Sequence, residues 1–143
     1  MKANNLKYLN KILIVEDNKP IRKLLKASTE SNGLEADVAE NGLEALNNID
    51  FLSEQGLSYP IISTDLVMPK MDGIELIAKI SERFGKGKIL QPEMYVLSGG
   101  HPRIGEIENI DAYGLIRKHY QKPMSPNQFA KELKEFYDSM RVQ

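Results

Sequence analysis

Short apolar runs recur along the chain, and each is followed by polar or turn-forming residues. The clearest are residues 11–15, 60–64, 93–97 and, with a weaker pattern, 116–121. Short runs rich in β-branched residues and bounded by turn formers are typical of strands buried in a sheet. Residues 34–39 alternate roughly between apolar and polar positions and are predicted to form a further strand.

The segments between these runs carry apolar residues at helical spacing and begin with residue types that cap helices. Residues 41–44, 72–75 and 125–128 follow capping-box patterns, and Asn18 with Pro20 can begin an earlier helix. We interpret the apolar stripes as core rather than as membrane or cofactor surfaces. The residues expected to face inward are Ile21, Leu24, Leu25 and Ser28 in the first helix, Leu43, Leu46 and Ile49 in the second, Ile74, Ile77 and Ile80 in the third, and Phe129, Leu133, Phe136, Tyr137 and Met140 in the last.

The alternation of strands and helices predicts an α/β fold with a parallel sheet covered by helices on both faces. Right-handed crossovers narrow the topology. Five strands in the order 2-1-3-4-5 with five helices make the flavodoxin-like, doubly wound arrangement. The strand order is that of this fold and does not follow from the periodicity itself. We expect residues 1–10 to be a frayed lead-in and residues 11–143 to form one domain.

Charged and polar side chains stand at the carboxyl ends of the predicted strands. Glu16 and Asp17 follow the first strand, Asp65 the third, Ser98 the fourth and Lys122 the fifth. In a parallel sheet these ends meet at one edge, which is where open α/β sheets bind ligands. Taken alone, Asp65 could equally be a helix cap or a turn residue. The matching groups at the other strand ends favour a site with chemistry.

The acids of this edge favour a particular kind of ligand. Crowded carboxylates resist full ionisation, and a divalent cation relieves their repulsion. Oxygen ligands without Cys or His favour Mg²⁺, Mn²⁺ or Ca²⁺ over zinc. Mg²⁺ takes few carboxylates and completes its shell with water and phosphate oxygens, and Lys122 and Ser98 could contact the remaining phosphate oxygens. The sequence therefore predicts a phosphoryl site in which a carboxylate is the nucleophile.

Four stretches resemble, in the same order along the chain, the receiver domain of two-component response regulators. They are residues 12–18, 65–73, 97–99 and 122–123, and the resemblance covers the chain from about residue 11 to residue 140. Each stretch lies at the end of a predicted strand, so the combination is more specific than any single motif. The resemblance implies a phosphoacceptor switch in a phosphorelay, of the stand-alone, chemotaxis type.

The resemblance also implies how a phosphoryl group and a metal ion are held. Asp65 matches the phosphoacceptor, which takes the phosphoryl group of a phosphohistidine. Asp17 matches a direct Mg²⁺ ligand, and the backbone carbonyl of Val67 matches another. Glu16 matches the second acid of the pair, which is usually Asp in the family. Its extra methylene group should be tolerable, for example through a bridging water.

Three further positions match the switch of the family. Lys122 matches the lysine that pairs with the phosphoacceptor and then with the phosphoryl group, and Ser98 matches the switch hydroxyl. An aromatic residue often stands three positions before the lysine, where this chain has His119, with Tyr120 as its neighbour. His119 could turn inward as a flat ring or could be a fixed surface histidine, and both readings stay open. We do not expect His119 to bind metal, because His101 is the only other histidine and the acids suffice.

Composition excludes several classes of function. The net charge is −1, which does not favour direct binding to nucleic acid, and the chain has no cysteine for disulfides or zinc. No apolar run is long enough to insert into a membrane, and a cytoplasmic location is expected. The resemblance implies a sensor histidine kinase or a histidine phosphotransfer domain as phosphodonor. It also implies a downstream protein bound through the last helix, strand and helix, and it allows a phosphorylation-dependent homodimer.

Two alternatives to a stand-alone switch remain open. The chain could be the receiver segment of a hybrid kinase or a relay intermediate, in which Asp65 passes the phosphoryl group onward. The chain ends soon after its last predicted helix, so output is expected to come from partner binding or from a larger protein. A metal-dependent aspartyl phosphatase is disfavoured, because that class resembles an Asp-x-Asp pattern and position 67 is Val. We expect no enzymatic activity beyond self-phosphorylation and self-dephosphorylation.

Overall fold

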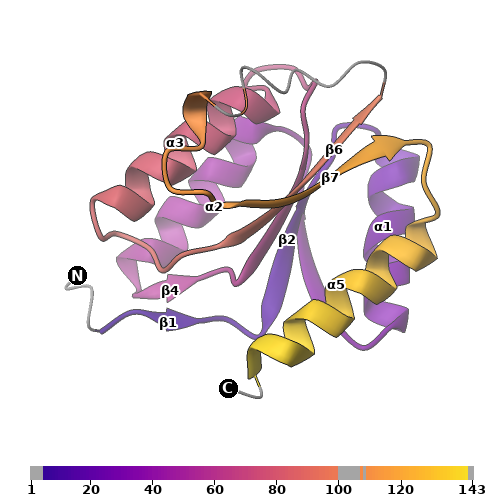
Figure 1. The fold of residues 1–143 in the computed structure, drawn as a ribbon, viewed down its shortest axis with the longest axis horizontal. Coiled ribbons are helices and arrows are strands. Elements are labelled where there is room, and N and C mark those ends of the chain that lie inside the picture. Colours follow the sequence, from indigo (N-terminus) through magenta and orange to yellow (C-terminus); the bar gives the residue numbers. More distant parts are fainter. Residues whose placement is uncertain (1–4, 100–106, 108, 142–143) are drawn as a thin grey trace.

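The computed structural model describes residues 5–99, 107 and 109–141. Its main strands are β2 (Lys11–Val15), β3 (Glu35–Ala39), β5 (Ile61–Asp65), β6 (Glu93–Gly99) and β7 (Ile116–Lys122). They form one parallel sheet in the order β3-β2-β5-β6-β7 (Figure 1). This order confirms the predicted 2-1-3-4-5 arrangement. It places the ends of β2 and β5 side by side.

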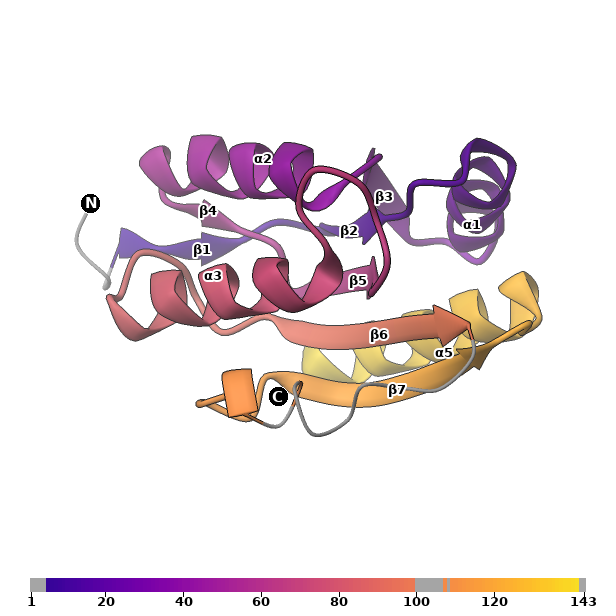
Figure 2. The same ribbon diagram turned by 90° about the horizontal axis from the view of Figure 1, so that it is seen from above.

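Helices cover both faces of this sheet. Helices α1 (Lys19–Ser31) and α5 (Pro126–Arg141) lie on one face, and α2 (Gly42–Glu54) and α3 (Gly73–Gly85) lie on the other (Figure 2). The described residues thus contain four helices of this length, where the sequence predicted five. The missing one was expected between β6 and β7, and residues 100–106 and 108 lie outside the described residues. Only a short helical piece is described in that connection, at positions 107, 109 and 110.

Each of the four helices begins where the sequence predicts. The side-chain oxygens of Asn18, Asn41, Asp72 and Ser125 each accept a hydrogen bond from the backbone N–H three residues later. These bonds satisfy N–H groups that the first turn of a helix leaves without a partner. Capping therefore fixes the points at which the chain leaves the sheet edge and turns into the helices.

The strand β2 shows how the sheet divides the core into two clusters. Ile12 and Ile14 pack in the cluster under α1 and α5, whereas Leu13 and Val15 pack in the cluster under α2 and α3. All four side chains are buried, as expected for a central strand covered on both faces. Each such side chain contributes about 1.5–3 kcal/mol through burial. This burial holds the strand ends, and the residues that follow them, in fixed positions.

Three residues predicted to face inward are exposed instead. In α1 the buried line runs through Leu25 and Thr29, and Ile21 and Leu24 lie at its solvent side. In α2 the buried line contains Gly42, Ala45, Leu46 and Ile49, a stripe at steps of three and four residues. Leu43 lies off that stripe and is exposed. The sequence pattern gave the apolar residues of these helices but placed the boundary of the buried face wrongly.

Residues 7–9 of the lead-in are also more ordered than predicted. Strand β1 (Lys7–Tyr8) pairs in parallel with β4 (Leu57–Ser58), and the two form a separate small sheet. The backbone N–H groups of residues 7 and 9 donate to carbonyls at positions 56 and 58, each over 2.8 Å. The Tyr8 hydroxyl donates to the carbonyl of Gln91 over 2.6 Å. Two residues are too few for an alternating pattern, so this strand could not be predicted from periodicity.

The ladder between β6 and β7 contains one irregularity. Met94 pairs with Ile116, but Tyr95 pairs with Lys118, so Arg117 has no opposite residue. This is a β-bulge, in which two residues of one strand lie opposite one residue of its neighbour. The guanidinium carbon of Arg117 lies 3.7 Å from the centroid of the Phe136 ring in α5.

Candidate functional site

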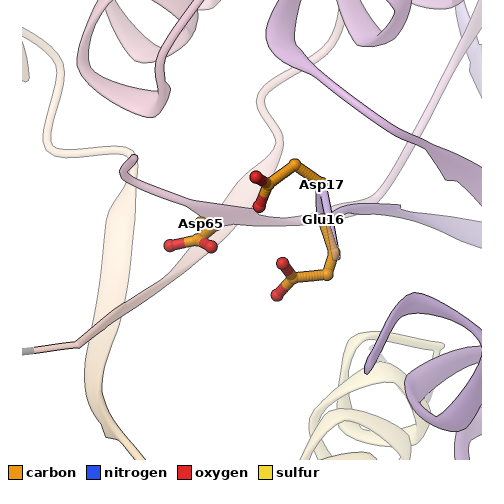
Figure 3. A group of neighbouring side chains, drawn as sticks. All are labelled: Glu16, Asp17 and Asp65. Carbon is orange, nitrogen blue, oxygen red and sulfur yellow. The ribbon is translucent and has the colours of Figure 1, made fainter. Parts of the chain in front are cut away.

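Three carboxylates meet at the carboxyl end of the sheet. Glu16 and Asp17 follow the last residue of β2, and Asp65 is the last residue of β5. The two strands are paired, with Val15 opposite Thr64, so these acids become neighbours. One oxygen from each carboxylate lies within 4.8 Å of the others, and Figure 3 shows the three groups turned toward a common space. The convergence predicted from the strand ends is therefore present.

The three acids differ in exposure. Glu16 is 2 % exposed and Asp65 is 8 % exposed, whereas Asp17 lies open to solvent. The buried pair forms the floor of the site and Asp17 stands at its mouth. A ligand can therefore approach from the side of Asp17.

Lys122 supplies the positive charge at the floor of the site. Its Nζ lies 2.8 Å from Oε1 of Glu16 and 3.0 Å from Oδ2 of Asp65. Burial alone would lower the pKa of Lys122, but its hydrogen bonds with Glu16 and Asp65 outweigh this effect and raise the pKa. The ammonium group therefore stays charged. The peptide bond between Lys122 and Pro123 is cis.

Burial is also the main influence on Glu16. It raises the pKa of this carboxyl group, and the nearby charge of Asp65 adds to the rise. The hydrogen bonds from Lys122 and from the backbone N–H of Asn18 act in the opposite direction and do not cancel it. Glu16 is therefore more easily protonated than an ordinary glutamate.

Backbone N–H groups hold the remaining carboxylate oxygens. The N–H of Asn18 donates to Oε2 of Glu16 over 3.1 Å, and the N–H of Leu66 donates to Oδ1 of Asp65 over 2.8 Å. With Lys122 on the other oxygens, both carboxylates of the floor are fixed at both ends. Such charge-assisted bonds are shorter and stronger than neutral ones.

Arg22 is a contributor that the sequence pattern did not reveal. Its Nη1 donates to the backbone carbonyl of Glu16 over 2.9 Å and to that of Asp17 over 3.3 Å. Arg22 thereby ties the first turns of α1 to the loop that carries two of the acids. One signal was present, because Arg22 lies four residues after the helix cap Asn18 and so shares its face of the helix.

The loop after Asp65 depends on a glycine. Gly73, the first residue of α3, donates its backbone N–H to the carbonyl of Leu66 over 2.8 Å. A Cβ atom at this position would lie 2.2 Å from the carbonyl oxygen of Asp65. Only glycine lets the loop fold back so closely under the acid. Val67 lies within this loop with its side chain 70 % exposed, so any role in the site falls to its backbone.

Ser98 and His119 lie beside the acids on the β6 and β7 side of the site. Ser98 follows Leu97, which is opposite Asp65, and Ser98 is only 3 % exposed. Its Oγ lies 2.9 Å from Nε2 of His119, whose ring is half-buried. Tyr120 belongs to the core cluster on the opposite face of the sheet and donates its hydroxyl hydrogen to Oε2 of Glu132 over 2.9 Å. The other histidine, His101, lies outside the described residues.

Sequence and structure comparisons place this arrangement in a family. The sequence profile of the response regulator receiver domain matches residues 12–134. The chain belongs to the response regulator receiver domain family. A CheY-like receiver domain protein from Methanospirillum hungatei is 23% identical, with a TM-score of 0.72 over 96% of this chain and 98% of its own. The receiver domain of the Francisella response regulator 1452 is 26% identical, with a TM-score of 0.71 over 92% of this chain and 99% of its own.

The curated relatives of this receiver domain are longer proteins. The probable transcriptional regulator ycf29 of Pyropia yezoensis is 30% identical over 120 residues, which cover 82% of this chain and 49% of the relative. A CpxR homolog of Haemophilus influenzae, a transcriptional regulatory protein, is 35% identical over 50% of this chain and 29% of its own length. The hybrid signal transduction histidine kinase L of Dictyostelium discoideum is 38% identical over 54% of this chain and 4% of its own. The chain spans less than half the length of each of these relatives.

The acids of the receiver domain fit a hard divalent cation. The donor set consists of three carboxylates without nitrogen or sulfur, and one of them faces solvent. Asp17 is the most exposed of the three acids and is therefore the most accessible direct ligand. Glu16 is the most buried of the three, so it would contribute mainly its charge. Within the described residues, no helix of the receiver domain has the length and hydrophobicity needed to cross a bilayer.

Proposed function

We propose that this receiver domain is a phosphoacceptor switch in which Asp65 takes a phosphoryl group from a phosphohistidine. The observation that carries the proposal is the position of the Asp65 carboxylate, which accepts a hydrogen bond from the partly buried ammonium group of Lys122 and lies close to two further acids. A receiver fold implies a histidine kinase or a histidine phosphotransfer domain as the partner that brings the phosphohistidine. The resulting phosphoaspartate would change how the domain binds a downstream protein.

The chemistry requires orientation of one carboxylate more than it requires an acid and a base. A carboxylate oxygen of Asp65 attacks phosphorus, an oxygen–phosphorus bond forms, and the phosphorus–nitrogen bond of the phosphohistidine breaks. The N–H of Leu66 and the ammonium group of Lys122 hold the two oxygens of Asp65 and so fix its plane. A fixed nucleophile lowers the entropic cost of in-line attack.

Charge on the transferred group has to be balanced as well. Lys122 can follow the negative charge from the carboxylate to the phosphoryl oxygens, because its Nζ already lies 3.0 Å from Asp65. We propose that Asp17 and Asp65, with the backbone carbonyl of Val67, would hold Mg²⁺ or Mn²⁺ directly, with Glu16 acting through water. The cation would supply charge neutralisation at the equatorial oxygens.

The proposal includes no catalysis on a separate substrate. Asp65 would accept the phosphoryl group and lose it by hydrolysis, so the domain would act on itself. A stand-alone switch with output through α5, β7 and the connection before β7 is the first form of the proposal, with a phosphorylation-dependent homodimer as one way to produce output. A receiver segment that passes its phosphoryl group onward is the second form, and the match to a hybrid kinase favours including it.

The test of the first step uses a small phosphodonor with Mg²⁺ and intact-mass measurement. The parent chain should gain one acid-stable, base-labile phosphoryl group, and Asp65→Asn should gain none. Asp72→Asn is the matched control, because Asp72 lies in the same loop and Asn can also cap α3. It should be labelled like the parent. Label that persists in Asp65→Asn would remove the proposed role of Asp65.

A second measurement separates the two forms of the proposal. The phosphorylated parent is mixed with an isolated histidine phosphotransfer domain, and the phosphoryl group is followed on both proteins. Transfer onto the histidine supports the relay form. Loss to water alone, together with phosphorylation-dependent partner binding, supports the stand-alone form.

A further inference from the structure

The hydroxyl of Ser98 has one hydrogen to donate, and the structure places a ring nitrogen of His119 within hydrogen-bond distance of it. Its Oγ lies 2.9 Å from Nε2 of His119, and the serine is almost fully buried. A hydroxyl group donates one hydrogen bond and accepts up to two. The direction of the bond between Ser98 and His119 therefore decides whether the hydroxyl hydrogen is free for a group at Asp65.

Two arrangements of this bond are chemically possible. If Nε2 of His119 carries no hydrogen, it accepts the hydroxyl hydrogen of Ser98, and the serine has no donor left for a phosphoryl oxygen. If Nε2 carries a hydrogen, it donates to Oγ, and the hydroxyl hydrogen can point elsewhere. Only the second arrangement allows Ser98 to contact His119 and a phosphoryl group together.

Asp65, Ser98 and His119 lie on three successive strands of the sheet, β5, β6 and β7. Leu97 of β6 lies opposite Asp65 of β5, so Ser98 comes directly after the residue that pairs with the acid. On the other side, His119 of β7 lies opposite Val96. Val96 belongs to the core cluster under α2 and α3, which places His119 on the same face of the sheet. Ser98 therefore lies on the strand next to that of Asp65 and contacts His119 of β7.

The ring of Tyr120, the next residue in β7, does not contact Ser98 in this way. Tyr120 packs on the opposite face, with its ring centroid 5.0 Å from that of Phe129, and its hydroxyl donates to Glu132. Tyr120 is thereby fixed to α5. Among the described aromatic and imidazole side chains of β7, His119 is the one in contact with Ser98.

We propose that His119 is a positioning residue that works through its Nε2 hydrogen. In the phosphorylated state Nε2–H donates to Oγ of Ser98, and Ser98 donates to the phosphoryl group on Asp65. Phosphorylation then selects the Nε2-protonated form of the ring, and β7 senses the phosphoryl group through a polar contact. This inference rests on the proposed phosphorylation of Asp65. The bond, rather than the flat shape of the ring, is what the position supplies.

The experiment compares His119→Gln with His119→Phe in the full chain. Gln can present an N–H donor to Ser98, whereas Phe keeps a flat ring without a donor. Beryllofluoride with Mg²⁺ serves as the phosphoryl mimic, and its affinity is measured by titration. We expect His119→Phe to bind the mimic about tenfold more weakly than the parent, and His119→Gln to remain within about threefold of it, as the loss of one hydrogen bond would give. A Phe variant that binds like the parent would overturn the proposal.

Two further measurements examine the bond itself. Nitrogen-15 NMR of the ring should place a hydrogen on Nε2 of His119 in the mimic-bound parent, with His101→Gln used to assign the two histidines. A mimic-bound ring without hydrogen on Nε2 would also overturn the proposal. In a double-mutant cycle, Ser98→Ala should lose the mimic-induced response while still accepting phosphate. Adding His119→Phe to Ser98→Ala should then cause little further loss, because both residues act through one bond.

The same samples separate a failure of the phosphoacceptor role of Asp65 from a failure of the role of His119. If the parent gains no phosphoryl group on Asp65 and does not bind the mimic, both the phosphoacceptor role and the role of His119 fail. If the parent is phosphorylated and His119→Phe responds as the parent does, only the role of His119 fails.

Discussion

The two halves of the site edge are built from different kinds of contact. At the ends of β2 and β5, Glu16 and Asp65 are held by charge-assisted bonds from Lys122 and from backbone N–H groups. Near the end of β6, Ser98 shares a single hydrogen bond between side chains with His119, which lies in the middle of β7. Bonds to charged groups contribute about 1.5–3 kcal/mol, whereas neutral ones contribute about 0.5–1.5 kcal/mol.

This difference suggests a division of labour within the site. The charged half is costly to rearrange, so it can keep the proposed nucleophile and the proposed cation ligands in place. The other half is held by a weaker bond, whose direction can reverse at little cost when a phosphoryl oxygen accepts the serine hydroxyl hydrogen. A ligand shifts an equilibrium only by its unequal affinity for two states. The contacts of Ser98 and His119 can differ between the two states more easily than those of the charged half. The predictions below perturb the charged half, from the largest expected effect to the smallest.

The largest effect is expected from Gly73→Ala. The added Cβ would meet the carbonyl oxygen of Asp65 at 2.2 Å and Cα of Leu66 at 2.8 Å, so the loop under the acid has to move. We expect a loss of about 3 kcal/mol in the free energy of unfolding in urea, together with slower phosphorylation of Asp65. Gly99→Ala is the control, since a Cβ there has no atom within 4 Å. Equal stability of the two variants would contradict this view of the loop.

The next effect is expected from Lys122→Met. Removing the ammonium group leaves Glu16 and Asp65 close together without their cation, and we expect a loss of about 2 kcal/mol in the free energy of unfolding. Mg²⁺ should restore stability more in this variant than in the parent, because it replaces the missing charge.

Lys118→Met is the matched control for Lys122→Met. Lys118 also belongs to β7 and pairs with Glu132 over 3.0 Å, but its side chain is half exposed. Exposed pairs contribute little, so the loss should stay below about 1 kcal/mol, without rescue by Mg²⁺. Equal losses in the two lysine variants would mean that the ion pairs of Lys122 stabilise the fold no more than an exposed ion pair does.

The smallest effect is a dependence on pH that Glu16 should produce. Burial raises the pKa of Glu16 above its ordinary value of 4.5, so the folded chain holds this proton more tightly than the unfolded chain does. Stability from this group is therefore present below pH 4.5 and is lost as pH rises through the raised pKa. Urea unfolding across this range should show the loss in the parent and a flatter profile in Glu16→Gln. A parent profile no steeper than that of the variant would contradict the raised pKa of Glu16.

The sequence predicted the order of the main strands and most of the charged half of the site. It could do so because parallel strands joined by right-handed crossovers bring their carboxyl ends to one edge. The positions of Glu16, Asp17 and Asp65 then follow from where each strand stops. The contact of Glu16 and Asp65 with Lys122 follows from the same rule, since β7 ends at the same edge.

Contacts that depend on rotamers or on very short elements were not predictable in this way. The bonds from Arg22 to two backbone carbonyls depend on how one long side chain folds back over the helix start. The pairing of β1 with β4 involves two residues on each strand, too few for a pattern. The exposure of Ile21 and Leu24 depends on how α1 tilts over the sheet, because an apolar stripe wider than the contact leaves its margin in solvent.

The bulge in the last strand has a consequence for which ring meets Ser98. A regular ladder continued from the pair of Met94 and Ile116 would set Tyr120 opposite Ser98 and His119 opposite Leu97. A slip of one residue exchanges the two faces of a strand. Because Arg117 bulges out of the ladder, the imidazole of His119 faces the site and the phenol of Tyr120 faces α5. The number of residues in the first part of β7 therefore determines whether an imidazole or a phenol lies beside Ser98. No residue of the site itself has to be substituted for this change.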